Sequence, residues 1–329
     1  MGDYRLSGMI GGVAVTVQTR DARLLPSLEG LSWSVLDRLP QPPAATVELY
    51  SLPLEDLAQY ATAGATEYHF QGSPAPELGF PTDVSVGIDH GTTTILYPSA
   101  GVATADRDWR RPQVGLTGAS AEEVGGQLLV MLLFMELAAH HGSFTLHASV
   151  AEQDAGAVLL VGPSGSGKTT SCLALGRAGW TMVCDDHAYV RPRPSPLTIW
   201  GAAGEMRLRE NTSDLWPDTT EALREGRHSY GKWHVRPATL GIASRPGSTL
   251  PRALLFPRVT GGDGPRLESM PPAQALQELL QATGVALCPA HTAAHFSALV
   301  DLAQSAPAFR LELGARMEDL PALVEGVLP

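Results

Sequence analysis

Apolar and polar positions alternate along the first third of the chain, which is the pattern of half-buried β-strands. Strands are predicted at residues 9–17, 45–50, 67–70, 84–88 and 93–97. The proline-rich residues 39–44 interrupt this pattern and predict a loop. Residues 1–118 are therefore predicted to form a mostly β N-terminal domain with one or two short helices, and the sequence indicates no role for it.

The period changes after residue 119. Ser120 and Glu123 have the spacing of a capping box, and the residues that follow are apolar nearly all round, which predicts a buried helix over 120–141. Strands are predicted at 144–150, 158–161 and 180–184, and helices at 169–177, 272–283, 290–304 and 317–327. A helix between strands is typical of α/β proteins. Residues 119–329 are therefore predicted to form a second domain of the α/β class.

The strand at 158–161 leads into a complete phosphate-loop motif, which runs Gly162-Pro163-Ser164-Gly165-Ser166-Gly167-Lys168-Thr169-Thr170. The glycines let backbone N–H groups turn inward around phosphate oxygens, and the next helix directs its positive N-terminus at the same anion. Lys168 is placed to reach the β- and γ-phosphates, and the Thr169 hydroxyl is placed to bind Mg²⁺. The motif predicts that the chain binds a nucleotide.

Two adjacent carboxylates, Asp185 and Asp186, follow the strand at 180–184. If this strand and the strand at 158–161 run parallel in one sheet, their carboxyl ends open onto the same edge, where ligands bind. One carboxylate could hold Mg²⁺ while the other accepts a proton from an attacking hydroxyl. The alternative is a polar turn, because Asp is common in turns.

Only two of the 23 basic residues are lysines, Lys168 and Lys232. Since an ammonium and a guanidinium are not interchangeable, Lys232 becomes a candidate for the site beside an ordinary surface role. Residues 187–260 are basic within an acidic chain, and Arg207 and Arg209 are further candidates for stabilising phosphate charge. His291 and His295 lie four residues apart on a predicted helix, but no third ligand lies near them in sequence, so no metal site is expected there.

Composition limits the classes of partner. The net charge of −11 argues against a general nucleic-acid binder, which needs a basic face. The most apolar segment, 128–139, is too short to span a bilayer and contains Glu136, so no membrane association is expected. Three cysteines without metal-ligand spacing fit reduced thiols in a cytoplasmic protein. The oligomeric state stays open, with a homo-oligomer as one alternative.

The run from His147 through the phosphate loop to Asp185-Asp186 resembles the catalytic core of the HPr kinase/phosphorylase family, whose core is similar to phosphoenolpyruvate carboxykinases. The resemblance implies a P-loop kinase core of that type, with ATP and Mg²⁺ as cofactors. It further implies that Asp185 is the base toward the acceptor hydroxyl, that Asp186 and Thr169 serve the metal, and that His147 lies beside the transferred phosphoryl group.

The family's downstream loop, which contains glycine and arginine and holds the HPr partner, has no counterpart here. Residues 204–209 and 231–236 stand in its place, which argues against HPr as the substrate. The pattern is closer to divergent relatives that phosphorylate serine in small molecules or in lasso-type precursor peptides. The predicted activity is therefore transfer of the γ-phosphoryl group to a serine-like hydroxyl of a peptide, protein or small molecule. The alternatives are a nucleotide-binding regulatory protein without transfer activity and a small-metabolite kinase of shikimate-kinase type.

Overall fold

The chain forms two compact units, each described here by itself. A computed structural model describes residues 3–28, 31, 33–61, 64–69, 83–118, 124–154, 156–229, 231–283 and 287–328. Unit 1 comprises Met1–His141 with Ala286–Thr292, and unit 2 comprises Gly142–Val285 with Ala293–Pro329. The predicted boundary between residues 118 and 119 falls at the edge of 119–123, which lie outside the described residues. In the observed division, the long helix after that boundary groups with the N-terminal part.

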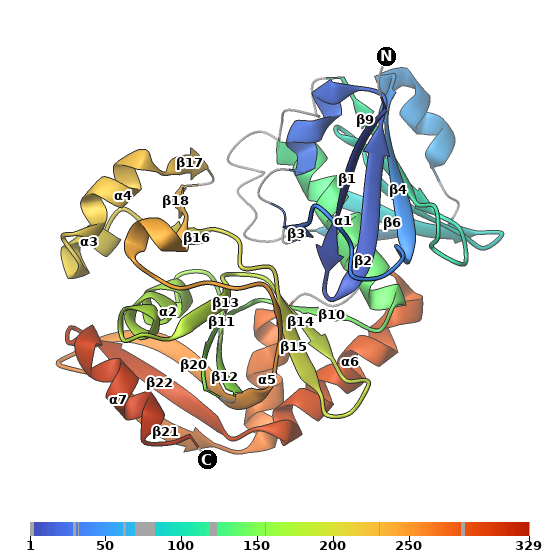
Figure 1. The fold of residues 1–329 in the computed structure, drawn as a ribbon. Helices are drawn as coiled ribbons and strands as arrows, with labels where there is room; N and C mark the ends of the chain where they lie inside the picture. The colour runs from blue at the N-terminus through green and yellow to red at the C-terminus, as the bar shows by residue number, and fades with distance from the viewer. Residues whose placement is uncertain are drawn as a thin grey trace. The chain divides into compact units, whose positions relative to one another are not determined.

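Unit 1 is built on one sheet, which among the described residues has nine strands in the order β3-β1-β2-β4-β9-β8-β7-β6-β5 (Figure 1). The strands are β1 (Tyr4–Ile10), β2 (Val13–Thr19), β3 (Ser34–Val35), β4 (Ala45–Leu52), β5 (Thr66–His69), β6 (Asp83–Asp89), β7 (Thr92–Tyr97), β8 (Gly101–Ala105) and β9 (Gln113–Thr117), with short 3₁₀ helices η1 (Ala22–Leu28) and η2 (Leu54–Tyr60). The pairs β2–β4 and β4–β9 are parallel, and the other pairs are antiparallel. The N-terminal region is therefore mostly β, as predicted.

The first predicted strand, residues 9–17, is wrong as a single element. The chain turns at Gly11 and Gly12, whose φ angles are 55° and 78°, and Ile10 pairs with Val13 across the turn. A two-residue turn with positive φ at both positions is the connection that glycine pairs favour in β-hairpins. The apolar run hid the turn, because residues on both of its sides are buried.

Helix α1 (Val124–His140) packs on β7, β8, β9 and η1. Its sequence is apolar on most sides, and Leu129, Leu133 and Leu137 are fully buried. The helix predicted over 120–141 is confirmed for this part. The predicted capping box, Ser120 and Glu123, lies outside the described residues, as does Phe70 at the end of the third predicted strand.

Unit 2 contains three sheets among the described residues. A six-stranded sheet has the order β13-β11-β12-β20-β22-β21, a four-stranded sheet β10-β14-β15-β19, and a three-stranded sheet β16-β18-β17. The strands are β10 (Phe144–Leu146), β11 (Ala148–Gln153), β12 (Gly156–Val161), β13 (Thr181–Cys184), β14 (Ala188–Arg191), β15 (Thr198–Gly201), β16 (Met206–Leu208), β17 (Arg227–Ser229), β18 (Lys232–Val235), β19 (Gly247–Thr249), β20 (Pro251–Gly262), β21 (Arg266–Met270) and β22 (Ala308–Gly314). The helices are α2 (Lys168–Arg177), α3 (Thr212–Leu215), α4 (Thr219–Glu225), η3 (Pro237–Leu240), α5 (Pro272–Ala282), α6 (Pro289–Ser305), η4 (Met317–Asp319) and α7 (Leu320–Glu325). The protein is thus mixed α/β with several sheets.

Helices cover both faces of the six-stranded sheet. Val158 and Leu160 of β12 share a buried cluster with residues of α2 and α7. The alternate residues of β12 face the opposite side of the sheet, where α5 packs against β12 and β22. All residues of β12 are buried, which is why this strand reads as a continuous apolar run rather than as an alternating one.

The strand predicted over 144–150 is divided at His147 into β10 and β11, which belong to different sheets. The His147 N–H donates a hydrogen bond to the Thr283 hydroxyl at 3.4 Å rather than to a strand neighbour. The single predicted strand is therefore wrong, and the interruption lies at a residue that the sequence marks as a site candidate.

Candidate functional site

Three strand ends place the candidate residues at one edge of the six-stranded sheet. Strand β11 lies between β12 and β13 and is antiparallel to both, so the start of β11 lies beside the ends of the other two. Ala148 pairs with Val161, and Val150 pairs with Cys184. The predicted shared edge is present: β12 and β13 run in the same direction within one sheet, with β11 between them. The intervening β11 brings a third set of side chains to the same edge.

The phosphate-loop residues connect β12 to α2 and have the backbone that the motif requires. Gly165 and Gly167 have φ angles of 84° and 105°, in the left-handed region that favours glycine. A Cβ on Gly167 would lie 2.2 Å from Leu313 Cδ1, so a larger residue would force the Leu313 side chain to move. The buried Ser166 hydroxyl has no hydrogen-bond partner among the described residues. An anion held in this loop would supply the missing partner, so the residues present fit a phosphate group.

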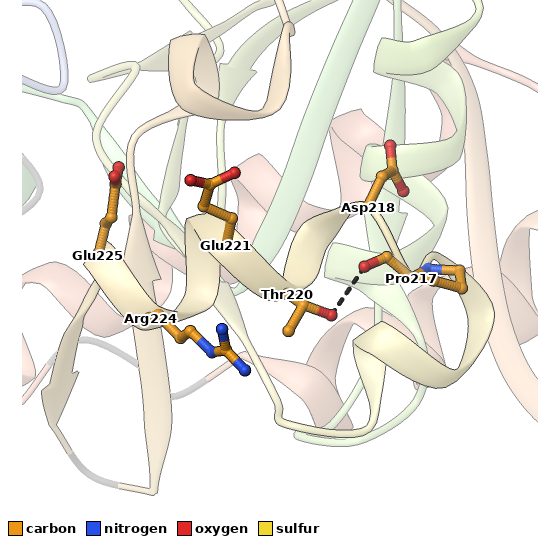
Figure 2. A pocket seen from close by; sticks show the side chains of 6 residues that line it. All are labelled: Pro217, Asp218, Thr220, Glu221, Arg224 and Glu225. Atoms are coloured by element: carbon orange, nitrogen blue, oxygen red, sulfur yellow. Dashed lines mark hydrogen bonds between the residues drawn. The ribbon is translucent and has the colours of Figure 1, made fainter.

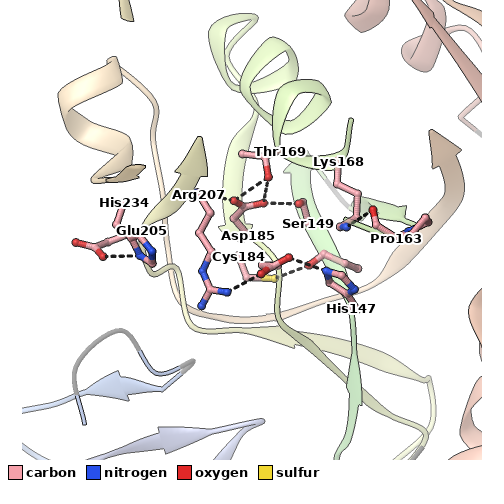
Figure 3. A network of polar contacts seen from close by, with 12 residues as sticks. His147, Ser149, Pro163, Lys168, Thr169, Cys184, Asp185, Glu205, Arg207 and His234 are labelled. Carbon is pink, nitrogen blue, oxygen red and sulfur yellow. Dashed lines mark hydrogen bonds and ion pairs between the residues drawn. The ribbon is translucent and has the colours of Figure 1, made fainter. Parts of the chain in front are cut away.

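Lys168 is the first residue of α2, and its side chain is only 5% exposed. Its ammonium donates to the carbonyls of Gly162 at 2.7 Å and Pro163 at 3.1 Å (Figure 3). Burial lowers the pKa of Lys168, while the charges of Asp186 and Asp185 act in the opposite direction. The ammonium therefore lies against the loop, close to the carboxylate pair.

Asp185 is linked to the loop through Thr169. The Thr169 hydroxyl donates to both carboxylate oxygens of Asp185, at 3.0 and 3.1 Å. The Ser149 hydroxyl and the Arg207 backbone N–H also donate to this carboxylate, the latter at 2.9 Å (Figure 3). Asp185 is buried, with its oxygens directed at the threonine that the motif assigns to Mg²⁺. A hydroxyl and a carboxylate are hard oxygen ligands, so this pair fits a magnesium ion.

Asp186 has a different set of partners. His147 Nε2 lies 2.7 Å from its Oδ1, and Arg207 Nη1 donates to its Oδ2 at 2.6 Å. Burial alone would raise the pKa of Asp186, but the hydrogen bond from His147 and the charges of its neighbours hold it well below its usual value. Asp186 also has a φ of 71°, a conformation that costs a non-glycine residue energy. The hydrogen bond with His147 and the Arg207 guanidinium thus favour the charged form of this carboxylate.

The His147 ring is fixed from both sides. Its Nδ1 faces the Ala282 carbonyl at 3.2 Å, and its Nε2 faces Asp186. Both partners are hydrogen-bond acceptors, so the ring is held between a backbone carbonyl and a carboxylate. For the neighbouring His187, burial and the Arg207 charge lower the pKa to about 3.

The two basic segments downstream pair with each other. In the three-stranded sheet, Arg207 of β16 is opposite His234 of β18, and Leu208 is opposite Trp233. The Arg209 guanidinium lies over the phosphate loop, with Nη2 3.3 Å from the position of a Cβ on Gly165. Lys232 lies close enough to lower the pKa of Lys168. All three predicted basic residues therefore lie near the loop or the carboxylate pair.

Ser149 is the residue at this site that the sequence did not single out. It lies two positions after His147 and donates to Asp185. This contact could not be predicted from the sequence, because Ser149 lies at this edge only when β11 lies between β12 and β13 in the sheet. His291 and His295, by contrast, do not converge: His295 Nε2 lies 2.9 Å from the Thr145 carbonyl, and His291 Nδ1 lies 2.8 Å from Glu136.

A separate pocket lies over α4 and the residues before it (Figure 2). It is lined by Pro217, Asp218, Thr220, Glu221, Arg224 and Glu225. The Thr220 hydroxyl donates to the Pro217 carbonyl at 2.7 Å, and Asp218 pairs with Arg177 at 2.7 Å. The pocket contains none of the predicted site residues.

Comparisons with known proteins give a distant relation. The model of a family described as SynChlorMet cassette protein ScmC matches residues 123–195, which include His147, the phosphate loop and the Asp pair. The solved Hpr(Ser) kinase/phosphatase from Coxiella burnetii is similar over 56% of this chain and 92% of that one, with 16% sequence identity and a TM-score of 0.29. No curated protein is significantly similar in sequence. The family match covers less than half of the chain, and the structural likeness is too low to carry an argument about activity.

None of the described helices is both long enough and apolar enough to cross a lipid bilayer.

Proposed function

We propose that this protein is a phosphotransferase that uses ATP and Mg²⁺ to phosphorylate a hydroxyl group. The observation that carries the proposal is that the two aspartates have different hydrogen-bond partners. Asp185 is bonded to the phosphate-loop threonine, and Asp186 is bonded to His147 and Arg207. A regulatory nucleotide site has no need for a second buried carboxylate beside the first.

The loop and its cations account for nucleotide binding. The backbone N–H groups of residues 163–169 and the Lys168 ammonium would hold the phosphates, and Arg209 lies over the same loop. Thr169 and Asp185 would hold Mg²⁺, which neutralises charge on the phosphoryl oxygens when bound. This assignment of the metal ligand differs from the one implied by the family resemblance, which gave the metal to Asp186.

Asp186 would then face the acceptor. Its carboxylate would accept the hydrogen bond of the attacking hydroxyl and take its proton as the new P–O bond forms and the bond to the leaving ADP oxygen breaks. The lowered pKa makes Asp186 a weak base, but a loose phosphoryl-transfer transition state requires orientation more than early proton removal. His147 and Arg207 would position Asp186, and Arg207 and Lys232 would offset the charge that spreads over the transferred group.

The proposal is tested with purified protein, γ-labelled ATP and Mg²⁺, offered serine-containing peptides and small hydroxyl compounds separately. We expect label on one acceptor class, and a loss of at least about 100-fold in transfer for Asp186→Asn with nucleotide binding retained. The matched control is Asp301→Asn, an exposed aspartate of α6. Nucleotide binding without transfer to any acceptor would instead support a regulatory protein, and release of free phosphate alone would support an ATPase.

A further inference from the structure

A second cluster of metal-ligating side chains lies in unit 1. Glu136 comes from the last turns of α1, Cys288 directly precedes α6, and His291 lies in the first turn of α6. One ligand atom from each residue can be chosen so that all lie within 4.8 Å of one another. The three side chains come from segments about 150 residues apart in the chain, yet all three residues belong to unit 1.

All three residues are buried, with 1% of Glu136, 2% of Cys288 and 8% of His291 exposed. Glu136 Oε2 lies 2.8 Å from His291 Nδ1, and Oε1 accepts a hydrogen bond from the Leu287 N–H at 2.5 Å. The backbone N–H of His291 donates to the Cys288 carbonyl at 2.9 Å, which places both side chains on one turn. The Trp109 ring centroid lies 5.9 Å from that of His291, and the His140 centroid lies 5.8 Å from it. The donor set is thus held in place before any ligand arrives.

The chemistry of the donors selects the metal. Thiolate, imidazole and carboxylate together are the ligands of zinc, whereas magnesium and calcium prefer oxygen alone. A tetrahedral zinc ion separates its ligand atoms by roughly 3.5 Å, so ligand atoms within 4.8 Å of one another need to approach by at most about 1.3 Å. Burial raises the pKa of the Cys288 thiol, so zinc binding would release its proton.

Charge balance favours the same ion. The cluster would carry two negative charges, one on a Cys288 thiolate and one on the Glu136 carboxylate, with His291 uncharged. A divalent cation would cancel these two buried charges. Buried charges are costly unless they are paired or bind a metal.

We propose that Glu136, Cys288 and His291 bind a zinc ion that joins α1 to residues 287–292, with water at the fourth position. None of these three residues belongs to the phosphate loop, all of whose residues belong to unit 2. Its role is structural, because it ties together two segments that are distant in sequence.

The test is metal analysis of the full-length, tag-free protein after reconstitution with zinc and removal of excess metal. We expect about one zinc per chain in the wild type, and less than a tenth of that in Cys288→Ser and His291→Ala. The controls are Cys172→Ser, a buried cysteine of α2, and His90→Asn, an exposed histidine of unit 1, both of which should keep the metal.

Cobalt exchange gives a second readout, whose main result comes from the wild-type protein. Co²⁺ bound to the wild type should show the absorption of a tetrahedral ion with a thiolate-to-cobalt charge-transfer band, and this band should be absent in Cys288→Ser. Wild-type protein that keeps less than a tenth of an equivalent of zinc and shows no thiolate band would overturn the proposal. Equal zinc in the wild type, Cys288→Ser and His291→Ala would overturn it as well.

Discussion

Asp185 and Asp186 are neighbours in sequence with different partners in space. Asp185 accepts hydrogen bonds from Thr169 and Ser149, whereas Asp186 is paired with His147 and Arg207. The unusual φ of Asp186 turns the chain directly after β13, so the two carboxylates reach different groups. The backbone at a single residue thus separates the metal side of the proposed site from its acceptor side.

Substitution of each aspartate by asparagine should have distinct effects. We expect Asp185→Asn to raise the Mg²⁺ concentration needed for half-maximal transfer by about tenfold or more, because a ligand is weakened. Asp186→Asn should lower the maximal rate and leave the Mg²⁺ requirement unchanged. The measurement is the initial transfer rate across a Mg²⁺ series. Recovery of Asp186→Asn at high Mg²⁺ would assign the metal to Asp186 instead.

Gly167 is fixed by both its backbone and its neighbour. We expect Gly167→Ala to destabilise the protein by about 2 kcal/mol or more, because the residue has positive φ and an added Cβ would collide with Leu313. Urea unfolding followed by circular dichroism measures the change. Gly204→Ala is the control: nothing lies within 4 Å of a Cβ there, so its effect should stay within about 0.5 kcal/mol. Equal effects of the two substitutions would refute the steric argument.

Much of the candidate site could be predicted at the residue scale, because the phosphate loop is local in sequence. Its glycines, Lys168 and Thr169 form one continuous run. The partners of Asp185 and Asp186 could not be predicted, because they depend on which side chains of other strands reach each carboxylate oxygen. Arg207 lies 21 residues after Asp186 and meets it only through the three-stranded sheet.

At the scale of elements, the three-stranded sheet unites two segments that the sequence left unconnected. β16 and β18 pair with Arg207 opposite His234, and helices α3 and α4 lie between them in the chain. Such long-range antiparallel pairing has no local signal, unlike the helices at 272–283 and 290–304, whose periodicity was sufficient. The division of the strand at 144–150 was missed for a related reason, since the partner of the His147 N–H lies on a residue 136 positions away.

An acid-sensitive contact links this sheet to the loop before it. Glu205 lies 3.5 Å from His234 Nδ1 and 3.6 Å from Arg227, and the hydrogen bond with His234 lowers the pKa of Glu205 from 4.5. A carboxyl whose pKa is lowered by folding adds stability above its unfolded value, and that stability is lost as the pH falls through the folded value. We therefore expect Glu205→Gln to be less stable than wild type at pH 6, with the gap closing below about pH 4.5.

Urea midpoints measured between pH 6 and pH 3 check this expectation. The effect should be small, because Glu205 is more than one-third exposed and water screens its contacts. The matched control is Glu221→Gln, an exposed carboxylate on α4. A gap between wild type and Glu205→Gln that persists unchanged at pH 3 would show that the glutamate acts through packing rather than through its charge.

At the scale of the whole molecule, the two units do not follow the order of the chain. Residues 286–292 belong with the N-terminal part, although they lie between α5 and most of α6 in the sequence. Glu136 explains this grouping, because its carboxylate binds both the Leu287 N–H and His291. A buried acid in an otherwise apolar helix was visible in the sequence, but its partners were not.

The two proposed ligands bind residues of different units, which gives a prediction for hydrogen exchange. ATP with Mg²⁺ at about 100 times its Kd should stabilise the binding-competent fold by about 2.7 kcal/mol, and its direct protection should fall on residues 162–170. Zinc should protect the last turns of α1 and residues 287–292, whose side chains it joins. Mass spectrometry of deuterium uptake with each ligand alone measures both patterns.

Two variants separate these effects within the same experiment. Lys168→Ala should remove the protection by ATP and keep that by zinc, because the lysine ammonium donates to carbonyls of the phosphate loop. Cys288→Ser should do the reverse. Since each ligand contacts one unit, protection by zinc at the phosphate loop would contradict the separation of the two sites. Loss of the ATP effect in Cys288→Ser would contradict it equally, and would make the metal cluster a determinant of nucleotide binding.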